Sequence, residues 1–138
     1  MCGIAAVLSS RRPLEDRLPV LDEMLTSIAY RGQDGEGKLQ IPNQKLLGHR
    51  RLSIIDIEHG AQPMCSSDGR YSLIFNGEIY NYLELRQTLV QQGHRFETFS
   101  DTEVLLKLLI EYGEAGIKRL NGMFAFVFHD RQANQWIA

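Results

Sequence analysis

The order of apolar and polar positions along the chain predicts both strands and helices. Short apolar runs, or runs in which every second residue is apolar, are typical of strands. We expect strands at residues 4–8, 46–49, 53–57, 71–75, 95–99, 124–128 and 134–138. The run at 124–128 is apolar at every position, which predicts that both of its faces are covered and that it lies between two layers.

Apolar residues spaced three and four apart predict helices. The first helix covers residues 18–28, and we expect Gly32 to end it in a left-handed conformation. The second helix begins after Asn81, because Glu84 follows it at the spacing of a capping box. Gly93 is the expected end of this second helix.

The strongest helix start is the sequence Ser-Asp-Thr-Glu at 100–103. A serine followed three residues later by glutamate satisfies N–H groups that the first turn leaves free. The predicted helix runs through Leu109 and ends at Gly113, and a shorter helix covers 115–120. The glycine-rich segment 30–37 is expected to be a loop.

Strands and helices are interspersed without regular βαβ repetition, so we predict an α+β layered domain. A chain of 138 residues is long enough for one core and cramped for two. The net charge of −2 argues against a nucleic-acid or membrane-surface partner. The longest apolar runs are far shorter than the roughly 20 residues of a membrane-spanning helix. The chain starts without a basic leader, so we expect a cytoplasmic protein.

Cys2 is the sharpest chemical feature of the sequence. Removal of Met1 would leave Cys2 with a thiol and a free α-amine. Their ordinary pKa values of about 8.5 and about 8 lie near neutrality, so the amine can take the thiol proton at little cost. Such an N-terminal nucleophile needs no histidine, but position alone favours a buried cysteine without chemistry. Cys65 receives no role, and in a cytoplasmic chain we expect at least one free thiol.

The pair Asn76-Gly77 has two interpretations. An Asn-Gly pair after an apolar strand is the strongest short signal for a hairpin turn. The side-chain amide of Asn76 and the N–H of Gly77 are also two donors that can point at one oxyanion. Residues 78–81 lead into a helix rather than a return strand, which favours the site over the hairpin.

Two charged residues also have a structural and a functional interpretation. Asp101 lies in the first turn of a predicted helix, where it either stabilises the helix dipole or stays ionised to pair with a substrate ammonium. Arg51 lies between two strand-like runs and either grips a carboxylate or is solvated. The histidines show no metal-ligand spacing and no glycine-rich phosphate loop is present, so we expect neither a metal nor a nucleotide site.

Several short motifs occur in order along the whole chain. They are MCGI at the start, YRGQD at 30–34, HRRLSIID at 49–56, GAQPM at 60–64, FNGEIYNYLELR at 75–86, SDTE at 100–103 and GMFAFVFHD at 122–130. Together they resemble the N-terminal glutaminase domain of the glutamine-hydrolysing asparagine synthetase family, which consists of class II amidotransferases and N-terminal-nucleophile hydrolases. The family usually has His and Pro where this chain has Tyr30 and Gln33.

The resemblance implies a fold and a set of catalytic residues. The fold would be a four-layer αββα sandwich, truncated here at its C-terminal end. Cys2 would attack the side-chain amide of glutamine with its own α-amine as the base, and Asn76 and Gly77 would form the oxyanion hole. The products would be glutamate and ammonia, by way of a glutamyl thioester.

The resemblance also implies how glutamine is held. Arg51 would bind the α-carboxylate, and Glu78 and Asp101 would hold the α-ammonium. Main-chain groups of Leu52 and Ile54 would line the pocket. A free amino acid carries one charge of each sign, so these side chains are complementary to it.

Finally, the resemblance implies partners outside the chain. Residues 1–138 would form an incomplete glutamine amidotransferase type 2 domain with L-glutamine as substrate and no cofactor of its own. A synthetase domain or subunit would need ATP and Mg and would amidate an acceptor, most simply aspartate. An unpaired sheet edge favours self-association. Two alternatives stay open: an inactive amidotransferase-like remnant that acts as an interaction module, and a structural domain in which Cys2 is incidental.

Overall fold

The computed structural model describes residues 2–8, 13–41 and 45–138. In chain order their elements are β1 (Gly3–Val7), α1 (Leu14–Ser27), η1 (Ala29–Arg31), β2 (Gly35–Ile41), β3 (Lys45–Arg51), β4 (Met64–Cys65), β5 (Tyr71–Ile79), α2 (Tyr82–Gln91), α3 (Asp101–Tyr112), η2 (Gly113–Arg119), β6 (Gly122–Asp130) and β7 (Gln135–Ile137). The strands pair antiparallel into two sheets, with the orders β1-β3-β2 and β4-β5-β6-β7.

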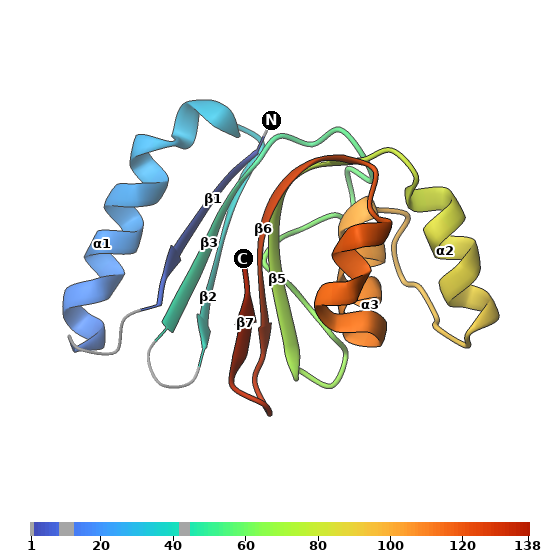
Figure 1. Ribbon diagram of the computed structural model, residues 1–138. Coiled ribbons are helices and arrows are strands. Elements are labelled where there is room, and N and C mark those ends of the chain that lie inside the picture. The colour runs from blue at the N-terminus through green and yellow to red at the C-terminus, as the bar shows by residue number, and fades with distance from the viewer. Residues whose placement is uncertain (1, 9–12, 42–44) are drawn as a thin grey trace.

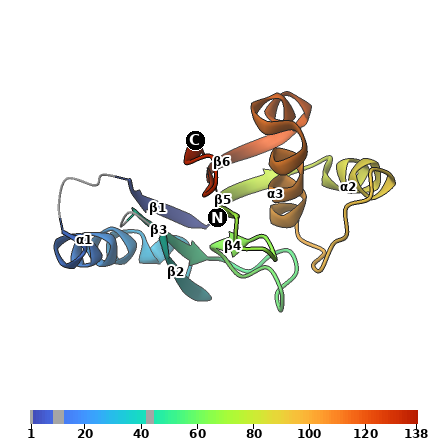
Figure 2. The ribbon, with the colours of Figure 1, turned by 90° about the horizontal axis from the view of Figure 1, so that it is seen from below.

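The two sheets pack face to face between two layers of helices (Figure 1). Helix α1 covers the outer face of the first sheet, and α2 and α3 cover the outer face of the second. Figure 2 shows the same separation from below. The first sheet comes entirely from residues 3–51 and the second from 64–137. The predicted αββα sandwich is confirmed in these described layers.

The inner strands bury both faces because successive side chains point to opposite layers. In β3, Leu46 joins the cluster under α1, and Leu47 joins the cluster between the sheets. In β6, Val127 joins the cluster between the sheets, whereas Phe126 and Phe128 pack with the leucines of α3. This confirms the prediction that the strand lies between two layers.

The sequence predicts the start of one helix correctly and misreads another. Ser100 Oγ accepts the N–H of Glu103 at 3.2 Å, so α3 begins at the predicted cap. Asn81 lies at the N-terminus of α2, but its side chain makes no cap. Its Nδ2 donates to the carbonyl of Arg119 and its Oδ1 accepts the N–H of Asn121, each at 2.9 Å. The predicted cap is wrong because both ends of this amide bind the connection between η2 and β6.

Glycines follow the helices for different reasons. Gly113 and Gly93, with φ of 55° and 96°, follow α3 and α2 as predicted. Gly32 is extended rather than left-handed, with φ of −147°. A Cβ there would lie 2.5 Å from the main-chain carbonyl of Arg50, so this glycine permits close approach of the chain to β3. The short helix expected at 115–120 is the 3₁₀ helix η2.

Two runs predicted as strands, 53–57 and 95–99, are loops. Carboxylate side chains accept hydrogen bonds from N–H groups of these runs, which in a sheet would bind the carbonyl groups of a partner strand. Asp34 accepts an N–H from the first run at 2.7 Å, and Asp56 and Glu103 each accept one from the second at 2.7 Å. These side-chain acceptors remove the need for a ladder partner.

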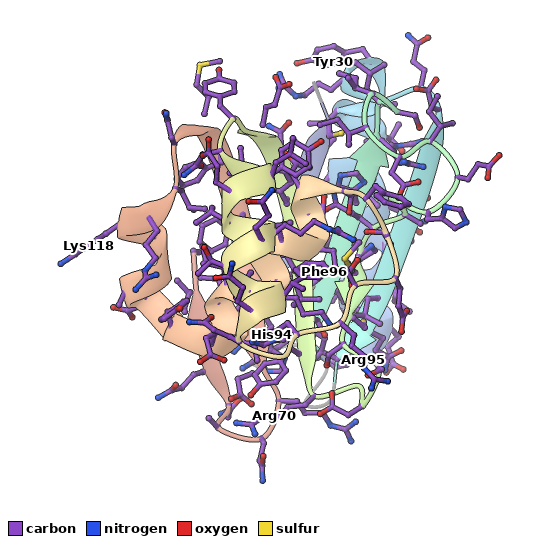
Figure 3. The ribbon with its side chains drawn as sticks, turned by 90° about the vertical axis from the view of Figure 1, so that its right-hand side faces the viewer. Tyr30, Arg70, His94, Arg95, Phe96 and Lys118 are labelled. Carbon is purple, nitrogen blue, oxygen red and sulfur yellow. The ribbon has the colours of Figure 1, made fainter. Side chains whose placement is uncertain are left out.

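The second of these loops also wraps around a cation. Arg86 on α2 donates to the carbonyl of Thr98 at 2.7 Å. Its guanidinium lies 4.2 Å from the ring centre of Phe96 and 5.3 Å from that of Phe99. Figure 3, which looks onto α2 and α3, shows Phe96 in this connection. The aromatic residues therefore contact the arginine instead of forming a strand.

Two further boundaries differ from the sequence predictions. Asn76 and Gly77 lie inside β5, which stays in register with β6 until Ile79. The hairpin-turn interpretation is therefore wrong. Strand β2 begins at Gly35, so the loop expected at 30–37 is shorter than predicted. The final strand is confirmed as β7.

Candidate functional site

A cavity of about 100 Å³ opens where the N-terminal end of β1, the loop after β3, the C-terminal half of β5 and the start of α3 meet. In Figure 1 this is the end of the sandwich at which β5 and β6 curve over α3. All of the sequence-predicted site residues except Asn76 line this cavity. They are Cys2, Arg51, Leu52, Ile54, Gly77, Glu78 and Asp101. Residues far apart in the chain therefore share one site.

Cys2 lies against the chain that follows β3. Its Sγ is 3.5 Å from the carbonyl oxygen and 3.4 Å from the N–H nitrogen of Leu52. The carbonyl of Cys2 accepts a hydrogen bond from Arg31 Nε at 2.9 Å. The thiol is half-buried and lines the cavity. Contacts on both its side chain and its main chain thus fix the position of Cys2.

Arg51, the last residue of β3, is held in the cavity wall by carbonyl groups. Its Nη1 donates to Ile57 at 2.8 Å and its Nη2 donates to Asp56 at 2.6 Å. A Cβ at Gly60 would lie 2.7 Å from Nη2, so the glycine makes room for the guanidinium. In the described part of the chain no carboxylate forms an ion pair with Arg51. A guanidinium has five N–H donors, so others remain for an anion.

The loop that holds Arg51 is itself fixed by Asp56. This residue has a left-handed backbone with φ of 48°. Its carboxylate accepts the N–H of Phe99 at 2.7 Å and that of His59 at 3.2 Å. The hydrogen bond from Phe99, followed by those from His59, lowers the pKa of Asp56 below its ordinary value despite the opposing effect of burial. The carboxylate therefore stays ionised and holds the loop against Phe99, which lies just before α3.

Two carboxylates face the cavity on the side of β5 and α3. Asp101 is 5% exposed and its Oδ2 accepts the N–H of Ile79 at 3.1 Å. Burial raises the pKa of Asp101, and the nearby Glu78 raises it further, while main-chain hydrogen bonds oppose both effects. The main-chain N–H groups at the start of α3 lower this pKa, as a helix N-terminus does, but burial has the larger effect. Neither acid has an ion-pair partner within the described ranges.

The edge of β5 presents one main-chain donor to the cavity. In an antiparallel strand, alternate residues direct their N–H and C=O groups to the same edge. The N–H groups of Phe75 and Ile79 leave the edge away from β6, where they bind Gln62 Oε1 and Asp101 Oδ2. Because the register with β6 is unbroken, the N–H of Gly77 points the same way. Gly77 lines the cavity at this edge.

Asn76 departs from the prediction because it does not line the cavity. It is half-buried. Its Oδ1 is buried and accepts no hydrogen bond from the described residues. An unpaired buried amide oxygen is costly unless a ligand or a change of rotamer satisfies the group.

Sequence reasoning missed several cavity residues. Gln62, Thr102 and Met123 line the cavity without having been assigned a role. The only signal for Gln62 was its place in the GAQPM motif, because its side chain acts on a strand that follows it in the chain. Cys65 is exposed on β4, outside this cavity.

The described residues form neither a cluster of metal ligands nor a helix that could span a membrane. Over residues 2–8, 13–41 and 45–138, no three histidine, cysteine or acidic side chains gather closely enough to hold a metal ion. No helix in the same ranges has both the length and the apolar character needed to cross a bilayer.

A family model described as a glutamine amidotransferase domain matches residues 1–138. The chain belongs to this family. The chain is 42% identical over 138 residues to a probable glutamine-hydrolysing asparagine synthetase of Schizosaccharomyces pombe, covering 100% of this chain and 24% of the relative. It is 41% identical over 136 residues to asparagine synthetase 3 of Bacillus subtilis, covering 97% of this chain and 22% of the relative.

Solved structures agree with the fold of this glutamine amidotransferase domain. A glutamine phosphoribosylpyrophosphate amidotransferase from B. subtilis matches with a TM-score of 0.66 and 25% identity over 78% of this chain and 31% of that one. The structure of an allosteric regulatory enzyme of purine biosynthesis matches with a TM-score of 0.64. The chain thus spans about a quarter of the first two curated relatives, at 24% and 22% of their length.

Proposed function

We propose that this domain hydrolyses L-glutamine to glutamate and ammonia and supplies the ammonia to a synthetase domain outside residues 1–138. The charges around the cavity carry the proposal. Arg51 lies on one side and the acids Glu78 and Asp101 lie on the other, with Cys2 lining the same cavity. An unpaired cation and two unpaired anions around one small cavity suit the carboxylate and ammonium of a free amino acid.

Substrate recognition follows from this arrangement. The free N–H groups of Arg51 bind the α-carboxylate, and Glu78 and Asp101 bind the α-ammonium. The bound ammonium offsets the repulsion between the two carboxylates, which favours the ionised form of Asp101. A simple amide without these groups would leave the charges around the cavity, including the buried Asp101, unpaired, so we expect strong selection for an amino acid. Main-chain groups of Leu52 and Ile54 line the path of the side chain.

In the first chemical step the α-amine of Cys2, freed by removal of Met1, takes the thiol proton. Sγ then forms a bond to the amide carbon of glutamine, and the carbonyl oxygen becomes an oxyanion. The N–H of Gly77 donates to this oxyanion, and the amide of Asn76 turns its Nδ2 towards it. The N–H of Gly77 is already directed at the cavity, and such a preorganised donor lowers the barrier because it stabilises charge as it develops.

Two bond cleavages complete the reaction. The protonated amine gives its proton to the departing nitrogen, the C–N bond breaks and ammonia leaves a glutamyl thioester on Cys2. Water then adds to the thioester with the amine as base, the C–S bond breaks and glutamate is released. The net reaction consumes one water for each glutamine, and the amine acts in turn as base and acid.

The names of the curated relatives support asparagine synthesis as the use of the ammonia. We propose aspartate as the acceptor and ATP with Mg as requirements of the synthetase domain. Residues 1–138 supply the glutaminase part of this reaction sequence. Ammonia formed at Cys2 would leave through the open end of the cavity towards that partner.

The test is the intact mass of the chain after exposure to 6-diazo-5-oxo-L-norleucine, an electrophile that mimics glutamine. We expect loss of Met1 and one adduct on the wild type and on Cys65→Ala, but none on Cys2→Ala. Cys65 is the matched control because it is the chain's other cysteine and is exposed. Absence of a Cys2-dependent adduct on processed, folded protein would overturn the proposal in favour of an inactive interaction module.

A further inference from the structure

Side chains rather than a strand cover the edge of β5 that faces the cavity. Strand β4 pairs only with Ser72 and Leu73, so it stops short of the residues that follow. Beyond it, Gln62 Oε1 accepts the N–H of Phe75 at 2.6 Å. The donors on either side of Gly77 are thus occupied by side chains, and the Gly77 N–H between them faces the cavity.

Gln62 connects this edge to the start of α3. While its Oε1 accepts from β5, its Nε2 donates to Thr102 Oγ1 at 3.3 Å. Thr102 is 4% exposed and follows Asp101. The main chain of Gln62 is also confined, because a Cβ at Gly37 would lie 1.8 Å from its carbonyl oxygen. One side chain therefore links the cavity edge of β5 to the helix that carries the acid.

His49 holds the other half of the same peptide segment. It lies on β3 with a fully buried side chain, and its Nε2 is 3.2 Å from the carbonyl oxygen of Phe75. Burial lowers the pKa of His49 to about 4, so the ring is neutral near pH 7. A carbonyl can only accept, so Nε2 carries the proton and donates it. Both polar main-chain groups of Phe75 are thus held by side chains from outside β5.

We propose that Gln62 and His49 are positioning residues that clamp Phe75 and thereby aim the N–H of Gly77 at the reacting oxygen of the substrate. The inference rests on the proposed glutaminase function and adds two residues to it. His49 is two residues from Arg51 on β3, and Phe75 is two residues from Gly77 on β5. The clamp therefore also sets the spacing between the group that binds the carboxylate and the donor to the oxyanion.

The clamp predicts a selective loss. Without the clamp, the charged groups of the substrate still bind their partners, but the N–H of Gly77 is misplaced. A misplacement of about 1 Å costs about 100-fold in rate. The probe is the aldehyde analogue of glutamine, with a formyl group in place of the side-chain amide. Addition of the Cys2 thiol forms an S–C bond, converts the C=O double bond to a single bond and moves the thiol proton to the former carbonyl oxygen, so binding of this probe measures the oxyanion site. Binding of L-glutamate measures the charged ends.

We expect Gln62→Met to weaken binding of the aldehyde by about tenfold or more and that of L-glutamate by less than about threefold. Methionine has a similar length and neither hydrogen bond. Gln87→Met on the exposed face of α2 is the matched control and should change neither affinity. Thermal unfolding of each variant establishes that it is folded.

A second pair of variants tests the other half of the clamp. His49→Leu removes the donor to Phe75, and we expect the same selective loss of aldehyde binding. His49→Gln keeps an N–H that can reach the carbonyl, and we expect it to retain most of the affinity. This pair decides the matter if Gln62→Met does not fold.

The outcomes separate the two proposals. A wild-type chain without Met1 that forms no Cys2 adduct with the aldehyde overturns the proposed function. A wild type that forms the adduct, together with a folded Gln62→Met that binds the aldehyde equally well, overturns the clamp alone. Parallel loss of aldehyde and L-glutamate binding overturns it as well, because that result indicates general damage to the cavity.

Discussion

Gly77 has two roles: it lets β6 pack closely against β5, and its N–H is the proposed donor to the oxyanion. A Cβ on this residue would lie 2.3 Å from the carbonyl oxygen of Met123 and 2.6 Å from Cα of Phe124. The backbone of β6 therefore passes where any side chain would stand. The same close approach keeps the Gly77 N–H at the edge of the cavity.

We expect Gly77→Ala to destabilise the domain by about 1–3 kcal/mol, because β5 and β6 must separate to admit the methyl group. Urea unfolding followed by circular dichroism measures the loss. Gly35→Ala is the control: it also lies in a strand, and its nearest atom would be Arg51 Cβ at 3.8 Å. Equal stability of the two variants would contradict the close approach of β6 to Gly77.

Asp101 gives a prediction about pH. Its folded pKa is raised, chiefly by burial, so between its ordinary value and the folded value the native chain binds more protons than the unfolded chain. Stability therefore falls as pH rises through this window. Asp101→Asn has no carboxyl group at this position and should lack that part of the fall.

The measurement compares urea unfolding of wild type and Asp101→Asn at about pH 4 and about pH 7. We expect the variant to gain stability relative to the wild type at the higher pH. The affinity for L-glutamate should rise as pH rises, because protonation of Asp101 at low pH removes an attraction for the ammonium. A stability difference that does not change with pH would show that Asp101 carries no raised pKa.

At the scale of elements, the N-terminus of α3 links stability to the site. Ser100 caps the helix through the N–H of Glu103 and is 2% exposed. We expect Ser100→Ala to cost about 1 kcal/mol of unfolding free energy. Because Asp101 is the next residue, L-glutamate binding should weaken as well. Chemical denaturation and calorimetric titration test the two effects, and an unchanged unfolding midpoint would contradict the cap.

The elements that the sequence predicted well are those whose own residues decide their structure. Ser100 accepts the N–H of Glu103, only three residues away, and the unbroken apolar run at 124–128 needs two covered faces wherever it lies. Cys2 was identifiable because an N-terminal cysteine combines a nucleophile with its base, whereas Arg51 and Asp101 were assigned through the resemblance. Their grouping in one cavity came only with the fold.

The elements that the sequence misread depend on distant partners. Residues 53–57 and 95–99 have strand-like composition, but Asp34, Asp56 and Glu103 satisfy their N–H groups in loops. Nothing in a local window reveals an acceptor that lies 43 residues away, as Asp56 does from Phe99. The effect of burial on the pKa of Asp101 could not be predicted for the same reason, because burial is a property of the packed molecule.

At the scale of the whole molecule, the cluster between the sheets keeps the site aligned. Leu47 is fully buried there together with Ile74 and Val127. We expect Leu47→Ala to cost about 2–5 kcal/mol through lost burial and a cavity. Leu83→Ala, at a position on α2 that is 57% exposed, should stay within about 0.5 kcal/mol of the wild type. Equal unfolding midpoints for the two variants would contradict the assigned packing.

The division of the chain between the sheets has a consequence for folding. Each sheet comes from its own continuous stretch, 3–51 and 64–137, and each contains hairpin pairs whose strands are near in sequence, namely β2 with β3, β4 with β5 and β6 with β7. Such local contacts form ahead of long-range docking. The cavity, however, takes Cys2 and Arg51 from one stretch and Gly77 and Asp101 from the other.

Recovery of the site during refolding should therefore lag behind recovery of local structure. Circular dichroism in the far ultraviolet follows the strands and helices of both stretches. We expect this signal to return before the capacity to form an adduct at Cys2. Simultaneous recovery would mean that the two stretches fold as one unit. With the expected order, a newly made chain passes through a period in which strands and helices have formed but Cys2 has no substrate pocket beside it.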